Sequence, residues 1–142
     1  MDLQIRDKVA LITGATGGMG FATAKILAEE GCRLVLSDLK IDQLEKHAAS
    51  LPTEVLCIAA DVTDQADVDT LARKGREKFG AIDIVVHTSG ITGAKGDPLE
   101  VTDADYLEAW QIDFMSADRM ARATFPAMRK KGWGRFVCIT SE

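Results

Sequence analysis

The sequence is poor in aromatic residues, proline and cysteine, and it contains no long apolar run. Only 6% of its 142 residues are aromatic, and there are three prolines and three cysteines. Cys32, Cys57 and Cys138 are too widely spaced for a CxxC pair or a metal site, so we expect buried thiols in a reducing compartment. No stretch approaches the roughly 18 apolar residues of a membrane span, and the first residues lack a signal-peptide pattern. These absences predict a soluble, cytoplasmic protein without a bound metal.

The charge balance is acidic, and this excludes another group of functions. The formal net charge is −5 at pH 7. Because binding to nucleic acid or to an anionic membrane requires clustered Lys and Arg, we expect neither partner. Apolar residues make up 46% of the chain and charged residues 27%, which is the balance of an ordinary globular protein. The length fits one domain covering residues 1–142.

Short apolar runs alternate with helical patterns along the chain. Strands are expected at residues 8–13, 33–38, 54–60, 82–87 and 135–140. Helices are expected at residues 18–30, 41–50, 63–79 with Thr63 as the cap, and 103–131 with a local kink at Pro126. Strands rich in Val, Ile and Leu that alternate with helices predict a parallel sheet covered on both faces. The expected fold class is α/β, a doubly wound parallel sheet of the Rossmann type with five strands.

The first strand leads directly into a glycine-rich turn, residues 13–20, with the sequence TGATGGMG. Its first glycine permits a tight turn, and the later glycines allow close approach of a pyrophosphate and close helix packing. The next helix begins within this turn, so its N–H groups and its positive end face the bound anion. The turn therefore predicts a phosphate-binding loop.

An acidic residue, Asp38, ends the second predicted strand and points to the kind of nucleotide. A carboxylate at this place accepts hydrogen bonds from the ribose hydroxyls of adenosine. It also repels a 2′-phosphate, by about 1 kcal/mol in water and about 4 kcal/mol at an intermediate dielectric for unit charges 4 Å apart. Gly17 and Leu39 offer no positive charge for such a phosphate, and Lys40 is expected to point elsewhere. We therefore predict NAD rather than NADP as the cofactor.

Two further segments follow predicted strands at the edge where ligands of such sheets bind. Asp61 can accept a hydrogen bond from the adenine amino group, and Val62 can pack on the ring. After the fourth strand, Gly90 lets the backbone pass close to the nicotinamide-side ribose. His87 is interpreted as a strand-end residue bonded to its surroundings rather than as an acid–base group, and His47 as a solvated residue of a polar helix.

Taken together, these segments resemble the short-chain dehydrogenase/reductase family over nearly the whole chain. The resemblance rests on five pieces: residues 13–20, Asp38, residues 61–63, residues 82–90 and residues 132–141. The spacing of the glycines also differs from that of Rossmann-type methyltransferases, which remain an alternative testable by binding of S-adenosylmethionine.

The resemblance assigns roles to individual residues. It implies that the nucleotide is held by these residues: Gly14, Thr16, Gly18, Met19, Gly20, Asp38, Leu39, Asp61, Val62, Ser89 and Gly90. It also implies that Ser141 is the catalytic serine, whose hydroxyl bonds the substrate oxygen while hydride passes between an alcohol or ketone carbon and the nicotinamide. Packing of the long helix against its copy in another subunit implies a homodimer or homotetramer.

The sequence departs from the family pattern in three places. His87-Thr88-Ser89-Gly90 replaces Asn-Asn-Ala-Gly, so the asparagine bond that steadies the sheet must be replaced or absent. Asp113 stands where the family has a helix asparagine that supports proton relay. It is interpreted either as a relay residue, whose buried charge would need the family lysine nearby, or as a structural helix residue.

The third departure is at the end, since the family's Tyr-x-x-x-Lys would lie beyond Glu142. We expect the sequence to be the N-terminal portion of a longer NAD-dependent enzyme. The alternative is a truncated or non-catalytic dinucleotide-binding protein, and a Tyr-x-x-x-Lys after Glu142 would distinguish the two.

Overall fold

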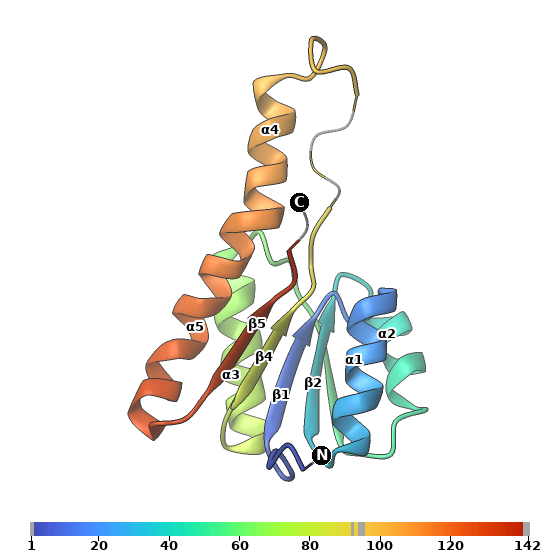
Figure 1. Cartoon of the computed structure of the whole chain (residues 1–142), viewed down its shortest axis with the longest axis vertical. Coiled ribbons are helices and arrows are strands. Elements are labelled where there is room, and N and C mark those ends of the chain that lie inside the picture. The colour runs from blue at the N-terminus through green and yellow to red at the C-terminus, as the bar shows by residue number, and fades with distance from the viewer. Residues whose placement is uncertain (1, 92, 94–95, 141–142) are drawn as a thin grey trace.

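The structure is a computed structural model that describes residues 2–91, 93 and 96–140. Strands and helices alternate along the chain (Figure 1). The elements are β1 (Val9–Thr13), α1 (Gly18–Glu29), β2 (Arg33–Asp38), α2 (Ile41–Ala48), β3 (Val55–Ala59), α3 (Gln65–Phe79), β4 (Ile84–His87), α4 (Asp103–Trp110), η1 (Gln111–Met115), α5 (Ser116–Lys131) and β5 (Arg135–Cys138). All five strands fall within the expected ranges, which confirms the order of elements that the sequence predicts.

The five strands form one parallel sheet with the order β3-β2-β1-β4-β5. The chain begins in the middle of the sheet, extends to one edge through β2 and β3, and then crosses to β4 and β5. The sheet is therefore doubly wound, as predicted, and its direction of growth reverses between β1 and β4. Ligands of such sheets bind beyond the carboxyl ends of the strands at this reversal.

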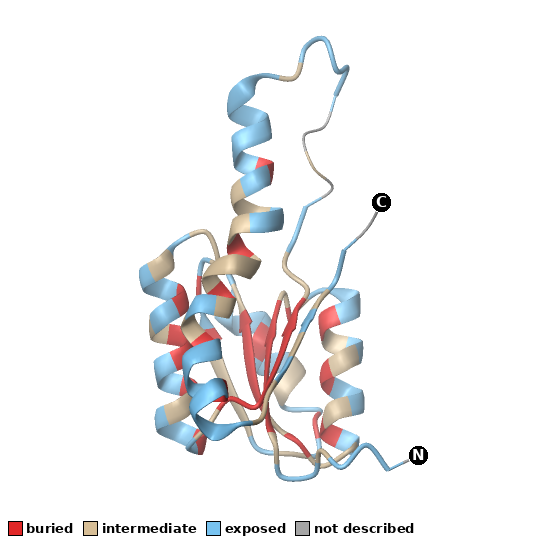
Figure 2. Ribbon diagram, turned by 60° about the vertical axis from the view of Figure 1, so that its left-hand side comes forward, coloured by how far each residue is buried: buried red, intermediate tan, exposed pale blue. Residues whose placement is uncertain are grey.

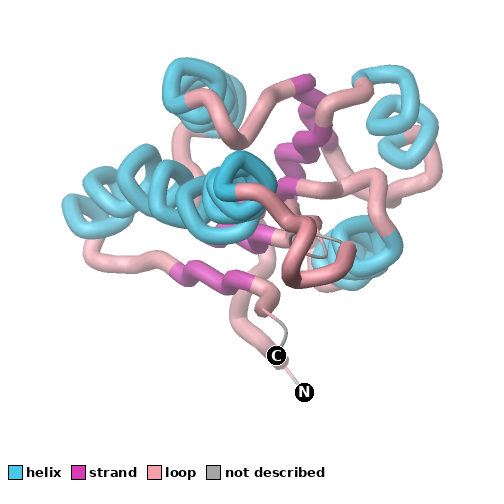
Figure 3. Tube along the Cα trace, turned by 90° about the horizontal axis from the view of Figure 1, so that it is seen from above, coloured by secondary structure: helices cyan, strands magenta, loops and turns pink. Residues whose placement is uncertain are grey.

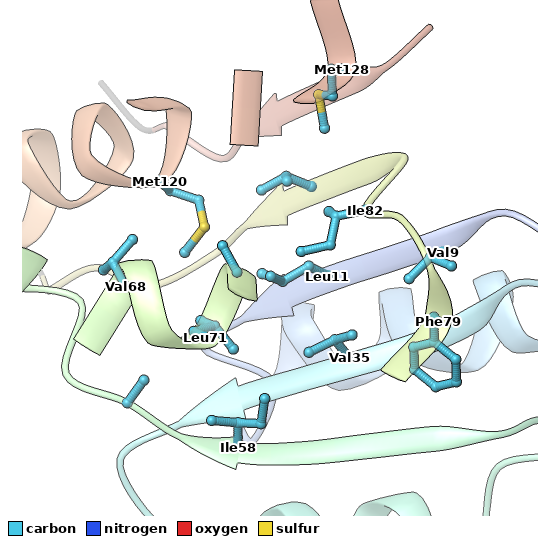
Figure 4. Packing of buried hydrophobic residues seen from close by; sticks show 13 residues of the cluster. Val9, Leu11, Val35, Ile58, Val68, Leu71, Phe79, Ile82, Met120 and Met128 are labelled. Carbon is cyan, nitrogen blue, oxygen red and sulfur yellow. The ribbon is translucent and has the colours of Figure 1, made fainter. Parts of the chain in front are cut away.

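Helices cover both faces of the sheet, as the view from above shows (Figure 3). One face packs on α3 and α5, and its core includes Leu11, Val35, Leu71 and Met120 (Figure 4). The other face packs on α1 and α2 through a second cluster that includes Ile12, Leu34, Ala24 and Leu44. Because successive side chains of a strand point to opposite faces, strands covered on both sides must be apolar throughout. The burial of all five residues of β1 follows from this arrangement.

The long helix expected at residues 103–131 is interrupted. Thr102 caps its start, and Asp105 completes a capping box. A single π-helical turn, η1, separates α4 from α5, whereas α5 continues through Pro126. The departure from regular α-helix is therefore at η1, a segment that contains no proline. The α4 end extends away from the sheet and is largely exposed (Figure 2).

One expected cap is wrong. The side chain of Asp64, not of Thr63, accepts a hydrogen bond at the start of α3, from the N–H of Ala66. Thr63 instead bonds Asp61, so the loop after β3 is built from two consecutive side-chain turns. Both turns use Asp as an acceptor for a backbone N–H two residues later, which is a common local structure for this residue.

Candidate functional site

A cavity of about 780 Å³ lies at the carboxyl ends of β1 to β4, at the point where the sheet reverses its direction of growth. Its lining comes from the turn after β1, the ends of β2, β3 and β4, and the junction of α4 with η1. The lining residues are Gly14, Thr16, Gly17, Ser37, Asp38, Leu39, Ala60, Asp61, Val62, Thr63, Thr88, Ser89, Gly90, Ile91, Glu108, Gln111 and Ile112. Segments far apart in the sequence therefore meet in one site.

The glycine-rich turn is shaped by close backbone contacts. Gly14 has φ +63°, and a Cβ there would lie 2.9 Å from Thr88 Oγ1. At Gly20 a Cβ would lie 2.3 Å from the carbonyl oxygen of Gly14, so no larger residue fits without moving the backbone. A Cβ at Gly18, by contrast, would meet no atom within 4 Å. Two of the glycines thus serve the fold of the turn, whereas Gly18 leaves open space beside the start of α1.

The start of α1 has N–H groups that can bind an anion. No side chain among the described residues caps this helix, whose N-cap is Gly17. The first N–H groups of a helix have no partner within it, and they lie at the positive end of the helix. The open side of the turn is therefore suited to a phosphate group.

Asp38 lies at the end of β2 and is held by three hydrogen bonds. Its Oδ2 accepts from the N–H of Thr16 at 3.0 Å and from Thr16 Oγ1 at 2.5 Å. Its Oδ1 accepts from the N–H of Leu39 at 2.8 Å. A carboxylate has about four acceptor sites, so one position remains for a further donor in the cavity. Thr16 thus fixes the orientation of this charge at the rim of the site.

Asp61 follows β3, the strand beside β2, and its side chain is also held by hydrogen bonds. Its Oδ1 accepts from the N–H of Thr63 at 2.8 Å and from Thr63 Oγ1 at 2.7 Å. These bonds lower the pKa of the Asp61 carboxyl below its ordinary value of 3.8. The carboxylate is therefore ionised at neutral pH, and it adds a second negative charge to this end of the cavity.

Asp113 follows the lining residues Gln111 and Ile112 in the chain without lining the cavity itself. Its Oδ1 accepts from the N–H of Ile91 at 2.6 Å. A Cβ at Gly90 would lie 3.2 Å from the same oxygen, so the small residue at this position permits the close approach of Asp113. The Asp113 side chain is exposed in the part of the chain that the structure describes.

The two histidines have different surroundings. His87 is 1% exposed and bonds Thr13 Oγ1 at 2.7 Å and Ser116 Oγ at 2.8 Å. Burial lowers the pKa of His87 from 6.5 to about 4. The interpretation of His87 as a bonded strand-end residue is thus confirmed. His47 is half-buried and stacks on Phe21 with ring centroids 3.9 Å apart, so it is not the fully solvated residue expected.

Comparison with known proteins defines the family. The family model described as short chain dehydrogenase matches residues 8–142. This chain belongs to the short-chain dehydrogenase family. It is 36% identical over 96% of its length to the uncharacterized oxidoreductase YxjF of Bacillus subtilis, of which it covers 54%. The chain thus spans about half the length of the curated relatives it matches.

Solved structures agree with the fold of this short-chain dehydrogenase. NAD+-bound xylitol dehydrogenase superposes with a TM-score of 0.92 at 31% identity, over 97% of this chain and 54% of the other. L-sorbose reductase from Gluconobacter frateurii, solved with NADPH and L-sorbose, gives a TM-score of 0.90 at 36% identity over the same shares. The two neighbours bind different nicotinamide dinucleotides, so their likeness supports a dinucleotide site without deciding between NAD and NADP.

Most residues that the sequence proposed for this dehydrogenase meet at the cavity. Eight line it: Gly14, Thr16, Asp38, Leu39, Asp61, Val62, Ser89 and Gly90. Gly18, Met19 and Gly20 belong to the same turn but do not line the cavity, and Met19 is 61% exposed. Ser141 lies outside the described residues.

Several lining residues were missed by sequence reasoning. Thr88 donates to the carbonyl of Thr13 at 2.7 Å, and so joins β4 to the glycine turn. Glu108, Gln111 and Ile112 come from the long helix, about 50 residues after the β3 loop that they face across the cavity. The strand-end position of Thr88 was a signal that could have identified it. No local pattern marked the helix residues.

Two further findings concern other classes of site. The described part of the chain has no helix whose length and apolar character would allow it to cross a membrane. Within the same residues, no group of three or more His, Cys, Asp or Glu side chains is placed to hold a metal ion.

Proposed function

We propose that this chain forms the nucleotide-binding part of an NAD-dependent oxidoreductase that interconverts an alcohol and a ketone. The observation that carries the choice of NAD is the cavity rim at Asp38. None of the described residues that line the cavity is Lys or Arg, whereas Asp38, Asp61 and Glu108 all line it. A 2′-phosphate at this rim would meet negative charge without a compensating cation, and this favours NAD.

The residues present fit a dinucleotide. The cavity volume of about 780 Å³ is within the range for cofactor sites, and the uncapped start of α1 suits a pyrophosphate. The open space at Gly18 is where an added side chain would intrude on such a group. These observations support binding of the pyrophosphate by the turn that contains Gly14, Gly18, Met19 and Gly20.

The remaining contacts with the nucleotide are proposed from the positions of residues at the strand ends. Asp38, oriented by Thr16 and followed by Leu39, would accept from the adenine ribose. Asp61 and Val62 would hold the adenine. Ser89 and Gly90, at the end of β4, would lie along the ribose of the nicotinamide, which is consistent with their place in the cavity lining.

The reaction follows from the cofactor and from two residues of this chain. NAD, when bound, supplies a hydride acceptor or donor. Ser141 would donate a hydrogen bond to the substrate oxygen and so orient the reacting carbon. Asp113, which bonds the Ile91 N–H, would either take part in the proton relay or keep the wall of the site in place.

Binding measurements test the cofactor proposal. We expect the protein to bind NADH at least about tenfold more tightly than NADPH, because of charge repulsion at Asp38. Asp38→Asn should reduce this preference by about tenfold. Asp42→Asn, which removes the same charge from α2 outside the cavity lining, serves as the control and should leave the preference unchanged. Equal binding of NADH and NADPH by the unaltered protein would contradict the proposal.

A substrate panel tests the reaction proposal. The two structural neighbours named above are described as a xylitol dehydrogenase and an L-sorbose reductase. Sugar alcohols and ketoses are therefore the first compounds to assay with NAD and NADH, followed by simple ketones. Loss of turnover in Ser141→Ala with unchanged NADH binding would support the serine's role. NADH binding without turnover of any compound by the complete protein would favour a non-catalytic nucleotide-binding protein.

We also propose assembly into a homodimer or homotetramer. Trp110 and Phe114 are about half exposed and stack on each other with centroids 4.3 Å apart, which leaves an apolar surface on the long helix. Light scattering during size-exclusion chromatography tests this, and a monomer at all concentrations would contradict it.

A further inference from the structure

A buried chain of polar contacts joins the sheet to the long helix. It runs from Thr13 at the end of β1, through His87 at the end of β4, to Ser116 at the start of α5. All three residues are no more than 1% exposed. The hydroxyl of Ser116 continues the chain to the carbonyl of Ile112 within η1. Three elements are thus connected through one imidazole ring.

The donors and acceptors in this chain have one consistent arrangement. A hydroxyl has a single proton, and Ser116 uses it to donate to the carbonyl of Ile112, which cannot donate in return. His87 Nε2 must therefore carry a proton and donate to Ser116 Oγ. A neutral imidazole then has an unprotonated Nδ1, which accepts from Thr13 Oγ1. The low pKa of His87, about 4, agrees with a neutral ring.

The Ser116 hydroxyl stands at the junction where η1 ends and α5 begins. A serine hydroxyl bonded to the carbonyl four residues earlier competes with the regular backbone bonds and bends a helix. The Nε2–H of His87 donates to the oxygen of the Ser116 hydroxyl. The proton of that hydroxyl is then directed to the Ile112 carbonyl. The imidazole is thereby tied through Ser116 to the Ile112 carbonyl of η1.

The position of η1 matters for the cavity. Gln111 and Ile112 line it, and Asp113 holds the N–H of Ile91 on the facing loop. We propose that His87 is a positioning residue, whose neutral Nε2–H form holds η1 in place through Ser116 and so fixes this wall of the site. The relevance of the wall to substrate rests on the proposed function. The hydrogen-bond chain itself does not rest on the proposed function, and its test needs no cofactor.

The tautomer of His87 is the first test. Long-range proton–nitrogen correlation spectra of the unaltered protein at pH 7 distinguish the two neutral tautomers and the charged ring. The sequence has two histidines, so His47→Gln assigns the remaining signals to His87. We expect the proton on Nε2. A proton on Nδ1, or a charged ring at pH 7, would overturn the proposal.

The second test asks whether the chain controls the cavity wall. The readout is the amide proton shift of Ile91, which the Asp113 carboxylate at 2.6 Å moves downfield. Ser116→Ala should remove most of this downfield shift. The matched control is Thr124→Val, because Thr124 is also buried in α5 and also donates to the carbonyl four residues earlier, but bonds no histidine. It should leave the Ile91 shift unchanged.

Variants of the ring separate hydrogen bonding from packing. His87→Gln retains a side-chain N–H for Ser116 and should keep a larger part of the Ile91 shift than His87→Phe, which has none. Equal effects of Ser116→Ala and Thr124→Val on Ile91, or equal effects of Gln and Phe at position 87, would overturn the proposal. If these variants do not fold, the tautomer in the unaltered protein still decides it.

Discussion

Two sides of the cavity are held in place by different contacts. The turn side, formed by Gly14, Thr16, Asp38 and Asp61, rests directly on the ends of β1, β2 and β3. The helix side, formed by Ile91, Gln111 and Ile112, belongs to an exposed loop and to a helix that extends away from the sheet (Figure 2). The turn side depends on close backbone packing, and the helix side depends on a few polar bonds.

This difference indicates how each side responds to change. On the turn side, Asp61 is held by a residue two positions away, whereas Asp38 is held by Thr16, 22 positions earlier. On the helix side, the bonds of Asp113 and Ser116 join residues 22 and 29 positions apart. Short-range contacts form at little cost in chain entropy, whereas long-range contacts require the sheet to be assembled first. We therefore expect the Asp61 turn to form early, whereas the bonds of Asp38, Asp113 and Ser116 depend on the rest of the fold.

The largest predicted effect is on the turn side. Gly20→Ala places a Cβ against the carbonyl of Gly14, and both atoms belong to constrained backbone, so we expect a loss of about 3 kcal/mol or more in the free energy of unfolding. NADH binding should be abolished as well. Urea denaturation and NADH fluorescence measure the two effects.

Gly18→Ala is the matched control for this prediction. Its Cβ would meet no atom of the protein within 4 Å, so stability should change by less than about 1 kcal/mol. NADH affinity should nevertheless fall, because the open space is the proposed pyrophosphate position. Equal destabilisation by Gly18→Ala and Gly20→Ala would remove the distinction between fold and ligand roles within the turn.

The second prediction concerns pH and the helix side. The pKa of His87 is 6.5 before folding and about 4 in the folded protein, so the unfolded chain binds a proton in this interval that the folded chain does not. The free energy of unfolding should therefore fall as the pH is lowered from about 6.5 to 4, by at most about 3 kcal/mol. The contribution of the neutral His87 ring to the free energy of unfolding is fully present above pH 6.5.

Urea denaturation between pH 4 and 8 measures this effect. The two groups that hydrogen-bond the ring are the hydroxyls of Thr13 and Ser116, and burial is the cause of the shift. In His87→Gln this part of the pH dependence should disappear. If its profile matches that of the unaltered protein, another group is responsible.

The smallest predicted effect is at Asp113. Asp113→Ala removes one exposed hydrogen bond to Ile91 and should cost about 0.5–1.5 kcal/mol of unfolding free energy. Asp113→Asn keeps an oxygen acceptor and should be nearly neutral. For the complete enzyme, an unchanged rate and pH profile in Asp113→Asn would exclude the proposed relay role and leave the structural one.

Much of the fold was predictable because its signals are local. The apolar runs of β1, β2 and β4 and the glycine turn each lie within one short segment, and the structure places all of them as expected. The long helix starts at residue 103 as expected, and its capping box, Thr102 with Asp105, is complete within four residues. The cap of α3 was misassigned because Thr63 and Asp64 are both good caps, and the bond of Thr63 to Asp61 decides between them.

The helix side was less predictable for a physical reason. Nothing near residues 111–115 marks a π-helical turn, and the contact from His87 to Ser116 beside it comes from another element. Glu108 and Gln111 likewise line the cavity from α4 and η1, which only the folded chain brings to the strand ends.

The sequence by itself determined the strand order in the chain, the glycine-rich turn and the acidic residue after the second strand. Each of these follows from residue types at fixed short spacings, which set backbone conformation and local hydrogen bonding. The tertiary structure alone decided which strand ends meet at one cavity, where the long helix departs from α-helical geometry, and which hydroxyls complete the bonds of His87. Those outcomes depend on contacts between residues distant in the sequence, and such contacts exist only after the two faces of the sheet are covered.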